Sequence, residues 1–299
     1  MTDIEETSAT DFLTGLRFGE CPRWHAGRLW YSDFFARTVS SVDVNDPASL
    51  RVEVEVPTEP AGLGWLPDGT LLVVSRQDRT VLKLVEGTLV HHGDLRPTAT
   101  FHANDMVVDE TGRAYVGNFG FDLDGLVENE GVMALFEPPG PPRTGLVRID
   151  PDGTATVAAD ELAFPNGTVI TPDGATLIVA ESVAGHLTAF DRSADGTLSN
   201  RRVWAAVPGL APDGMCLDAD GCVWVANAVA AECLRVAEGG QVVDKVRTSQ
   251  NAYACMLGGD DRRTLFVVTA PTSTESVARE RTDGKIEQAR VSVPGAGRP

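Results

Sequence analysis

The chain has 299 residues, 42% of them apolar, and a formal charge of −18 with only three lysines. Such an acidic chain is a poor partner for nucleic acid or for an anionic membrane. It has no run of the roughly 18 apolar residues that a transmembrane helix needs, and it begins with an acidic segment, MTDIEETSATDF, rather than a signal peptide. We therefore expect a globular protein of the cytoplasm with no nucleic acid or membrane partner.

The cysteines are odd in number and irregularly spaced, without a Cys-x-x-Cys pair. They are Cys21, Cys216, Cys222, Cys233 and Cys255. This pattern indicates neither a disulfide framework nor a zinc–thiolate site.

A short apolar strand, a turn and a second β-prone strand recur six times along the chain. The segments are 21–33, 63–75, 105–118, 167–181, 214–227 and 255–269, with turn residues Gly27, Gly69, Gly112, Gly174, Gly221 and Arg262. The turn residues lie 42, 43, 62, 47 and 41 residues apart. Four of these spacings match one four-stranded propeller blade of roughly 40–50 residues, and the long one marks an insertion.

The repeats predict an all-β fold, a single six-bladed β-propeller over 1–299. A β-sandwich would not repeat six times at this length, and the Trp-Asp dipeptide of WD repeats is absent. No segment keeps a 3.6-residue period long enough to predict a helix. The ring should close by pairing of the segment 12–18 with the C-terminal KIEQARVSV.

Equivalent positions on the innermost strands converge on the propeller axis. Counting back from the turns gives a first polar ring, namely Glu20, Ala61, Asn104, Asn166, Asp213 and Ala254. Two carboxylates and two amides on one narrow axis would repel one another and lack hydrogen-bond partners unless a cation lay among them. All four are oxygen ligands, which suits Ca²⁺ or Mg²⁺ and leaves Zn²⁺ or Mn²⁺ as other occupants.

Counting forward from the turns gives a second polar ring at the ends of the second strands. Its members are Asp33, Ser75, Asn118, Glu181, Asn227 and Thr269. Strand ends are generally polar, so this ring has a structural explanation as good as a functional one.

Four motifs resemble the senescence marker protein (SMP-30)/gluconolactonase/LRE family of six-bladed, calcium-dependent propellers that hydrolyse lactones. They are GECPRW at 19–24, HANDMVVDETGRAYVGN at 102–118, FPNGTVITPDG at 164–174 and PDGMCLDADGCVWVA at 212–226. Diisopropyl fluorophosphatase and paraoxonase are more distant relatives. The resemblance, which covers about 16–269, implies the metal ligands Glu20, Asn166 and Asp213 and a further site residue, Asn104.

The chain departs from the family pattern beside this site. The resemblance implies a substrate-contacting arginine where this sequence has His102, and a substrate-binding glutamate where it has Asp122. Asn118 and Phe121 are the other expected substrate contacts. His102 is a candidate general base or donor, although a lone histidine is more often structural.

The insertion at about 121–144 contains several apolar residues, namely Leu123, Leu126, Val127, Met133, Leu135 and Phe136. As a lid over the mouth it would favour a more hydrophobic substrate than a sugar lactone. The alternative is a solvent-facing loop.

These observations predict metal-assisted hydrolysis of a small lactone or ester. The ion would polarise the carbonyl, Asp213 would accept the proton of the attacking water and Asn104 would orient water or substrate. No Gly-x-Ser-x-Gly elbow or glycine-rich nucleotide motif is present. The alternatives are a phosphotriesterase-like hydrolase and a non-enzymatic calcium-binding propeller. Whichever function holds, we expect a monomer or small homo-oligomer.

Overall fold

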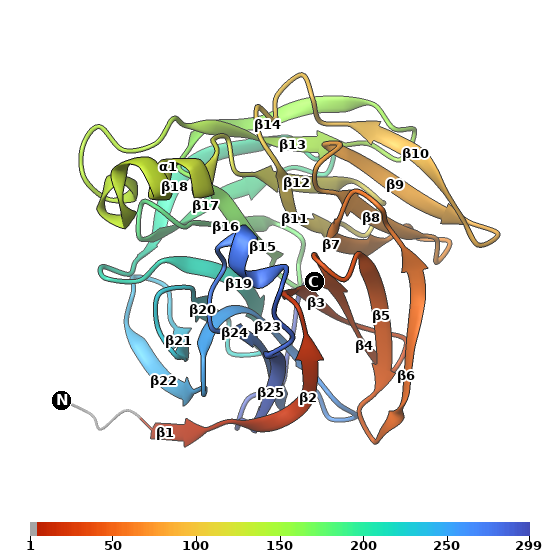
Figure 1. Ribbon diagram of the computed structural model, residues 1–299. Helices are drawn as coiled ribbons and strands as arrows, with labels where there is room; N and C mark the ends of the chain where they lie inside the picture. The colour runs from red at the N-terminus through yellow and green to blue at the C-terminus, as the bar shows by residue number, and fades with distance from the viewer. Residues whose placement is uncertain (1–4) are drawn as a thin grey trace.

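The computed structural model describes residues 5–299, which form six sheets arranged as blades around a central axis (Figure 1). In blades one to four the first strand in the chain lies innermost, in blades five and six the innermost strands are β19 and β23, and inner strands of neighbouring blades contact one another, as β7 does β11 and β15 does β19. The predicted six-bladed β-propeller is confirmed.

The first three blades follow the chain from the axis outward. Blade one has β3 (Gly19–His25), β4 (Arg28–Asp33), β5 (Thr38–Asp43) and β6 (Asp46–Glu55). Blade two has β7 (Pro60–Trp65), β8 (Leu71–Ser75), β9 (Thr80–Val85) and β10 (Thr88–Asp94). Blade three has β11 (Ala103–Val108), β12 (Ala114–Asn118), β13 (Thr144–Ile149) and β14 (Ala155–Leu162).

The last three blades continue this order, but two of them also use the N-terminal segment. Blade four has β15 (Pro165–Ile170), β16 (Thr176–Glu181), β17 (His186–Arg192) and β18 (Leu198–Ala206). Blade five has β19 (Pro212–Leu217), β20 (Val223–Asn227), β21 (Glu232–Val236), β22 (Val242–Arg247) and β1 (Glu5–Ser8). Blade six has β23 (Asn251–Gly258), β24 (Thr264–Ala270), β25 (Gly284–Arg290) and β2 (Thr10–Leu16).

The ring closes as the sequence predicts, because β2 pairs antiparallel with β25 from Thr10↔Gln288 to Leu16↔Gly284. The sequence did not predict that β1 would add to blade five, where it pairs parallel with β22. The N-terminal segment therefore joins two neighbouring blades.

The inner hairpins explain why the repeats are visible in the sequence. All six turn residues have positive φ, from 55° at Arg262 to 89° at Gly112. Glycine adopts this left-handed conformation without a steric penalty, which accounts for glycine at five of the six turns.

One predicted position in the first ring is wrong by one residue. In blade six the hairpin extends to Gly258↔Thr264, one pair further than Val108↔Ala114 in blade three. The same count from Arg262 therefore reaches Ala254, one residue short of the equivalent position. Tyr253, rather than Ala254, is the counterpart of Asn104.

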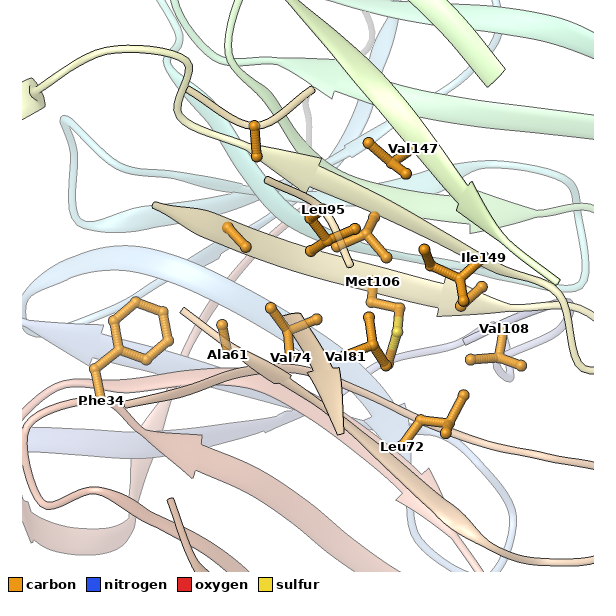
Figure 2. Packing of buried hydrophobic residues seen from close by; sticks show 14 of the residues in the cluster. Phe34, Ala61, Leu72, Val74, Val81, Leu95, Met106, Val108, Val147 and Ile149 are labelled. Atoms are coloured by element: carbon orange, nitrogen blue, oxygen red, sulfur yellow. The ribbon is translucent and has the colours of Figure 1, made fainter. Parts of the chain in front are cut away.

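The hydrophobic core fills the spaces between neighbouring blades. Figure 2 shows one such layer, in which Leu72, Val74 and Val81 of blade two face Met106 and Val108 of blade three. Close packing requires glycine where inner strands meet, since a Cβ on Gly62 would lie 2.5 Å from the Met106 Cβ.

Short helices that the sequence did not predict form at two insertions. The insertion in blade three forms α1 (Leu123–Glu130) and a 3₁₀ turn, η1 (Val132–Leu135), and blade six contributes α2 (Glu275–Ala278). These elements are too short to show a sustained period. Within residues 5–299 no helix is long and apolar enough to cross a membrane.

The C-terminal residues 291–299 cross one end of the central channel, near the label C in Figure 1. Backbone amides of the tail donate to blades six, five and four in turn, with Gly295 N to Arg262 O at 2.9 Å, Ala296 N to Leu217 O at 3.0 Å and Arg298 N to Ile170 O at 2.9 Å. Together with the hairpin turns, the tail lines a cavity of about 700 Å³. The candidate site lies at the other end, where the inner strands begin.

Candidate active site

A cavity of about 260 Å³ opens where the inner strands begin, and the polar residues of the first ring form its floor. Glu20, Asn104, Asn166 and Asp213 all line this cavity, each as the second residue of its strand. Each is at most 8% exposed. The structure thus brings together the four residues that the repeat register selects.

Hydrogen bonds orient the amides of the floor. Asn104 Nδ2 donates to Asn166 Oδ1 at 2.9 Å, and Asn166 Nδ2 donates to Ser182 Oγ at 3.1 Å. The Ser182 hydroxyl donates in turn to the Pro212 carbonyl at 2.7 Å, beside Asp213. Ser182, which also lines the cavity, therefore orients Asn166, although sequence reasoning did not select it.

The two carboxylates of the floor are in electrostatic conflict. Burial raises the pKa of Glu20 well above its usual value, and repulsion by Asp213 raises it further. Burial likewise raises the pKa of Asp213, with Asp105 adding to the effect. Neither floor carboxylate forms an ion pair within residues 5–299, and the attraction of Glu20 to Arg23 is weaker than its repulsion by Asp213.

The cationic side chain that attracts Glu20 already pairs with another carboxylate. Arg23 lies buried beneath the floor, where it pairs with Asp105 and donates to the Leu63 carbonyl at 3.1 Å and the Met106 carbonyl at 2.7 Å. Sequence reasoning missed this pair. The available signal was a charged residue at an otherwise buried strand position, since buried charges are generally paired.

The donor set of the floor fits a hard divalent cation. Two carboxylates and two amides supply only oxygen donors, with space in the cavity for water. In residues 5–299 no group of three or more His, Cys, Asp and Glu side chains is arranged to hold a metal, and the floor contains only two such residues beside its amides. A dication among them would relieve the conflict between Glu20 and Asp213.

The walls of the cavity are largely aromatic. Phe18, Phe34, Phe35, Phe101, Phe119, Phe136, Phe164 and Tyr253 line it. His102 lies against this surface, with its ring centroid 4.2 Å from that of Phe101 and 6.1 Å from that of Phe119. Burial, together with the positive charge of Arg76, lowers the pKa of His102 to about 4, so its imidazole is neutral at neutral pH.

Arg76 is the one cationic side chain that lines the cavity within residues 5–299. It pairs with Glu59, and with Glu275 at 3.3 Å, while Arg279 pairs with the same two glutamates. The Arg76 guanidinium also lies 5.3 Å from the ring centroids of both Phe34 and Phe119. Sequence reasoning missed this group, because its members come from distant segments.

Residues of two insertions, which we call the roof, also line the cavity. The blade-three insertion supplies the apolar side chains Leu123, Val127, Val132, Leu135 and Phe136 to the lining. Asp124 on α1 accepts a hydrogen bond from the Glu275 backbone amide of α2 at 2.7 Å, which joins the two insertions. Of the other apolar residues expected in a lid, Leu126 packs on the aromatic cluster and Met133 is 55% exposed.

Residues 18–271 match the family model described as the SMP-30/Gluconolactonase/LRE-like region. The chain belongs to this family. It is 27% identical over 291 residues to 6-deoxy-6-sulfogluconolactonase of Pseudomonas putida, with 94% of each chain covered. It is 26% identical over 298 residues to pentonolactonase XacC of Haloferax volcanii, with 96% of this chain and 94% of the relative covered.

A solved structure described as a calcium-binding protein, regucalcin, from Agrobacterium tumefaciens has the same fold. It aligns with a TM-score of 0.77 at 17% identity, covering 100% of this chain and 99% of the other. At this identity the likeness concerns the fold alone.

Two of the expected substrate contacts of this family member lie outside the cavity lining. Asn118 is 1% exposed and is bonded to the Gly145 carbonyl at 2.8 Å and the Thr144 hydroxyl at 2.8 Å. Phe121 is buried against Phe164 behind the cavity wall. Asp122 does line the cavity, and its Oδ1 accepts from the Gly125 amide at 3.0 Å, which caps α1.

Asn118 belongs to the second ring, whose members do not line the cavity. Three of them accept hydrogen bonds from the backbone that leads into an inner strand: Asp33 from Phe18 N at 3.1 Å, Glu181 from Ala163 N at 2.7 Å and Asn227 from Ala211 N at 3.2 Å. These hydrogen bonds agree with the structural explanation of this ring, and Asn118 lies outside the cavity lining.

Proposed function

We propose that the protein is a metal-dependent lactone hydrolase that opens a cyclic ester with an activated water. The observation that carries the proposal is the pair of buried carboxylates without a counter-ion, Glu20 and Asp213, on the floor of an enclosed cavity. The curated lactonases that align over nearly the whole chain support the choice of reaction.

Glu20, Asn166 and Asp213 would hold one divalent ion, for which Ca²⁺ is the first candidate and Mg²⁺, Zn²⁺ and Mn²⁺ are others. When bound, such an ion supplies polarisation of the substrate carbonyl and a lower pKa for a coordinated water. Asn104 neighbours Asn166 and would donate from its amide to a substrate oxygen.

Asp213 is our candidate for the general base. Its carboxylate would accept a proton from the water that attacks the lactone carbonyl carbon. The ring C–O bond then breaks, and the leaving alkoxide takes up a proton to give a hydroxy acid. The roof would limit the access of bulk water during this reaction.

The aromatic walls support a lactone that carries an apolar substituent rather than a polyhydroxylated sugar lactone. Sugar hydroxyls placed against phenylalanine rings would lose hydrogen bonds to water without replacing them. His102 occupies the position of the family arginine and would contact substrate as a neutral ring, through its edge or a single hydrogen bond.

Two other functions use the same site. A phosphotriesterase-like hydrolase would act on P–O or P–F bonds, and a non-enzymatic propeller would use the ion only to hold its blades together. A screen of γ-, δ- and larger lactones, aryl esters and phosphotriesters with a pH indicator, across several divalent ions, separates the three. Turnover of lactones that is lost on chelation supports our proposal, and turnover of none of the compounds would lead us to assign a binding protein.

We further expect the protein to act in the cytoplasm as a monomer or small homo-oligomer. Its five cysteines are all free thiols, and four of them are buried. This supports a reducing compartment.

A further inference from the structure

The charged side chains that line the cavity are strongly unequal in sign. Five are carboxylates and one is a guanidinium, namely Glu20, Asp122, Asp124, Asp213 and Glu275 against Arg76. With all of them ionised, even a bound dication would leave two excess negative charges around the substrate.

Arg76 does not offset this excess of negative charge, because its guanidinium is already paired with carboxylates. It forms one group with Glu59, Glu275 and Arg279, in which two guanidiniums meet two carboxylates. The rings of Phe34 and Phe119 flank its guanidinium. An anionic substrate would therefore have to displace a buried carboxylate to reach it, which leaves that carboxylate unpaired.

The remaining polar groups of the wall and roof offer an anion no positive charge. Asp122 and Asp124 form no ion pair within residues 5–299, and both face the cavity from the start of α1. His102 is neutral at neutral pH, since burial and Arg76 disfavour its protonated form. Among residues 5–299, the other strong donors of the lining are amides and hydroxyls.

We infer that this site selects uncharged lactones and rejects anionic ones, with Asp122 and Asp124 as specificity-determining residues. The inference rests on the proposed function and defines its substrate class. The same charge distribution acts on the product, because hydrolysis converts a neutral lactone into a carboxylate among like charges. Repulsion therefore favours release of the hydroxy acid.

The test uses two substrates that differ only in charge, a γ-butyrolactone bearing a propanoate side chain and its N-methyl amide. We expect kcat/KM of the amide to exceed that of the acid by about tenfold or more at low ionic strength. Added salt should narrow the ratio, because it screens the acidic roof.

The double variant Asp122→Asn/Asp124→Asn should also narrow the ratio by severalfold. Asparagine keeps the oxygen that accepts from the Gly125 and Glu275 amides, so the cap and the contact between the insertions are retained. The matched control is Asp68→Asn/Asp173→Asn, which removes the same charge from two hairpin turns at the opposite end of the channel. This control should leave the ratio unchanged.

Equal kcat/KM for acid and amide, or a ratio that the two double variants change alike, overturns the inference while leaving lactone hydrolysis intact. If neither lactone is hydrolysed, calorimetric binding of the corresponding cyclopentanones, as acid and amide, decides the matter. Selective binding of the amide analogue would then support charge selection although the proposed function had failed, and equal affinities would refute both.

Discussion

The two polar rings of the propeller begin as similar patterns and end with opposite roles. In both, mostly oxygen-bearing side chains at strand ends recur at blade spacing, and both are almost entirely buried. The second ring satisfies its polar groups locally, as Asp33 does by accepting from Arg17 N, Phe18 N and Ala36 N. In the first ring, Glu20 and Asp213 face a cavity, and repulsion between their carboxylates disfavours the charged forms.

This difference shows what distinguishes a scaffold residue from a site residue in a repeat fold. Burial and polarity are shared by the two rings, so neither property decides. The number of hydrogen bonds that the scaffold offers does decide, because a buried carboxylate with three backbone donors is stabilised and one beside another carboxylate is not. Variants of the first ring should therefore lower activity, and variants of the second ring should lower stability.

Asp213→Asn should have the largest effect on activity. We expect lactone hydrolysis to fall by at least about a hundredfold, since a proposed ligand and general base is lost. The metal-free protein should be no less stable, because one of two repelling buried charges is removed. Initial rates and thermal midpoints with and without a divalent ion measure both effects.

The matched control is Asp33→Asn in the second ring. It should lower the thermal midpoint and leave the rate per folded molecule unchanged, since its carboxylate serves the Arg17 and Phe18 amides. Equal losses of activity in the two variants would contradict the division between the rings.

Glu181→Gln should have the largest effect on stability. Burial alone would raise the pKa of Glu181, but hydrogen bonds from His186, Thr188 and the Ala163 amide outweigh it and lower the pKa to about 2. The shift from the ordinary value of 4.5 corresponds to about 3 kcal/mol of unfolding free energy. This contribution is complete above about pH 4.5 and is lost as the pH falls toward 2.

Urea unfolding at pH 7 and at low pH measures this contribution. The difference in unfolding free energy between wild type and Glu181→Gln should be close to 3 kcal/mol at pH 7 and should shrink toward pH 2. A difference that does not depend on pH would show that shape, not charge, matters at this position.

The sequence predicted most of the fold because each blade repeats one local signal. A turn residue at positive φ, such as Gly112, lies between two apolar strands, and both features are local. The predicted first-ring position in blade six was wrong because its inner hairpin is one residue pair longer. A count from Arg262 does not detect this extra pair. The addition of β1 to blade five depends on pairing across more than 200 residues, so no local pattern indicates it.

The floor of the site was predictable for the same reason, since four strands contribute equivalent positions. The walls and roof were less so, because Glu275 and Asp124 come from insertions that share no register, and the ion pairs of Arg76 join it to residues distant in sequence. His102 was predictable only in part. Its place beside Asn104 was foreseen, whereas its neutral state depends on burial and on Arg76.

His102→Gln tests whether a cavity residue outside both rings takes part in proton transfer. With its pKa near 4, His102 does not change charge between pH 5 and 8. We therefore expect kcat/KM to fall by less than about tenfold, the range of a single lost hydrogen bond, with the shape of the pH–rate profile unchanged over that interval. An ionisation near pH 6 to 7 in the wild type that disappears in the variant would instead make His102 the general base.

Tyr253→Phe should have the smallest effect, and it tests the corrected sixth position of the first ring. The Tyr253 ring packs edge-on against Phe18 with centroids 4.9 Å apart, burial raises the pKa of its hydroxyl to about 12, and the hydroxyl forms hydrogen bonds with Ser273 and Asn251. Loss of one such hydrogen bond should raise KM about threefold while kcat stays near the wild-type value. Tyr31→Phe, a buried tyrosine on β4 outside the cavity lining, is the control and should leave KM unchanged. A KM that does not change in Tyr253→Phe would show that the sixth position contributes only apolar surface, so that substrate is held by the floor and the roof alone.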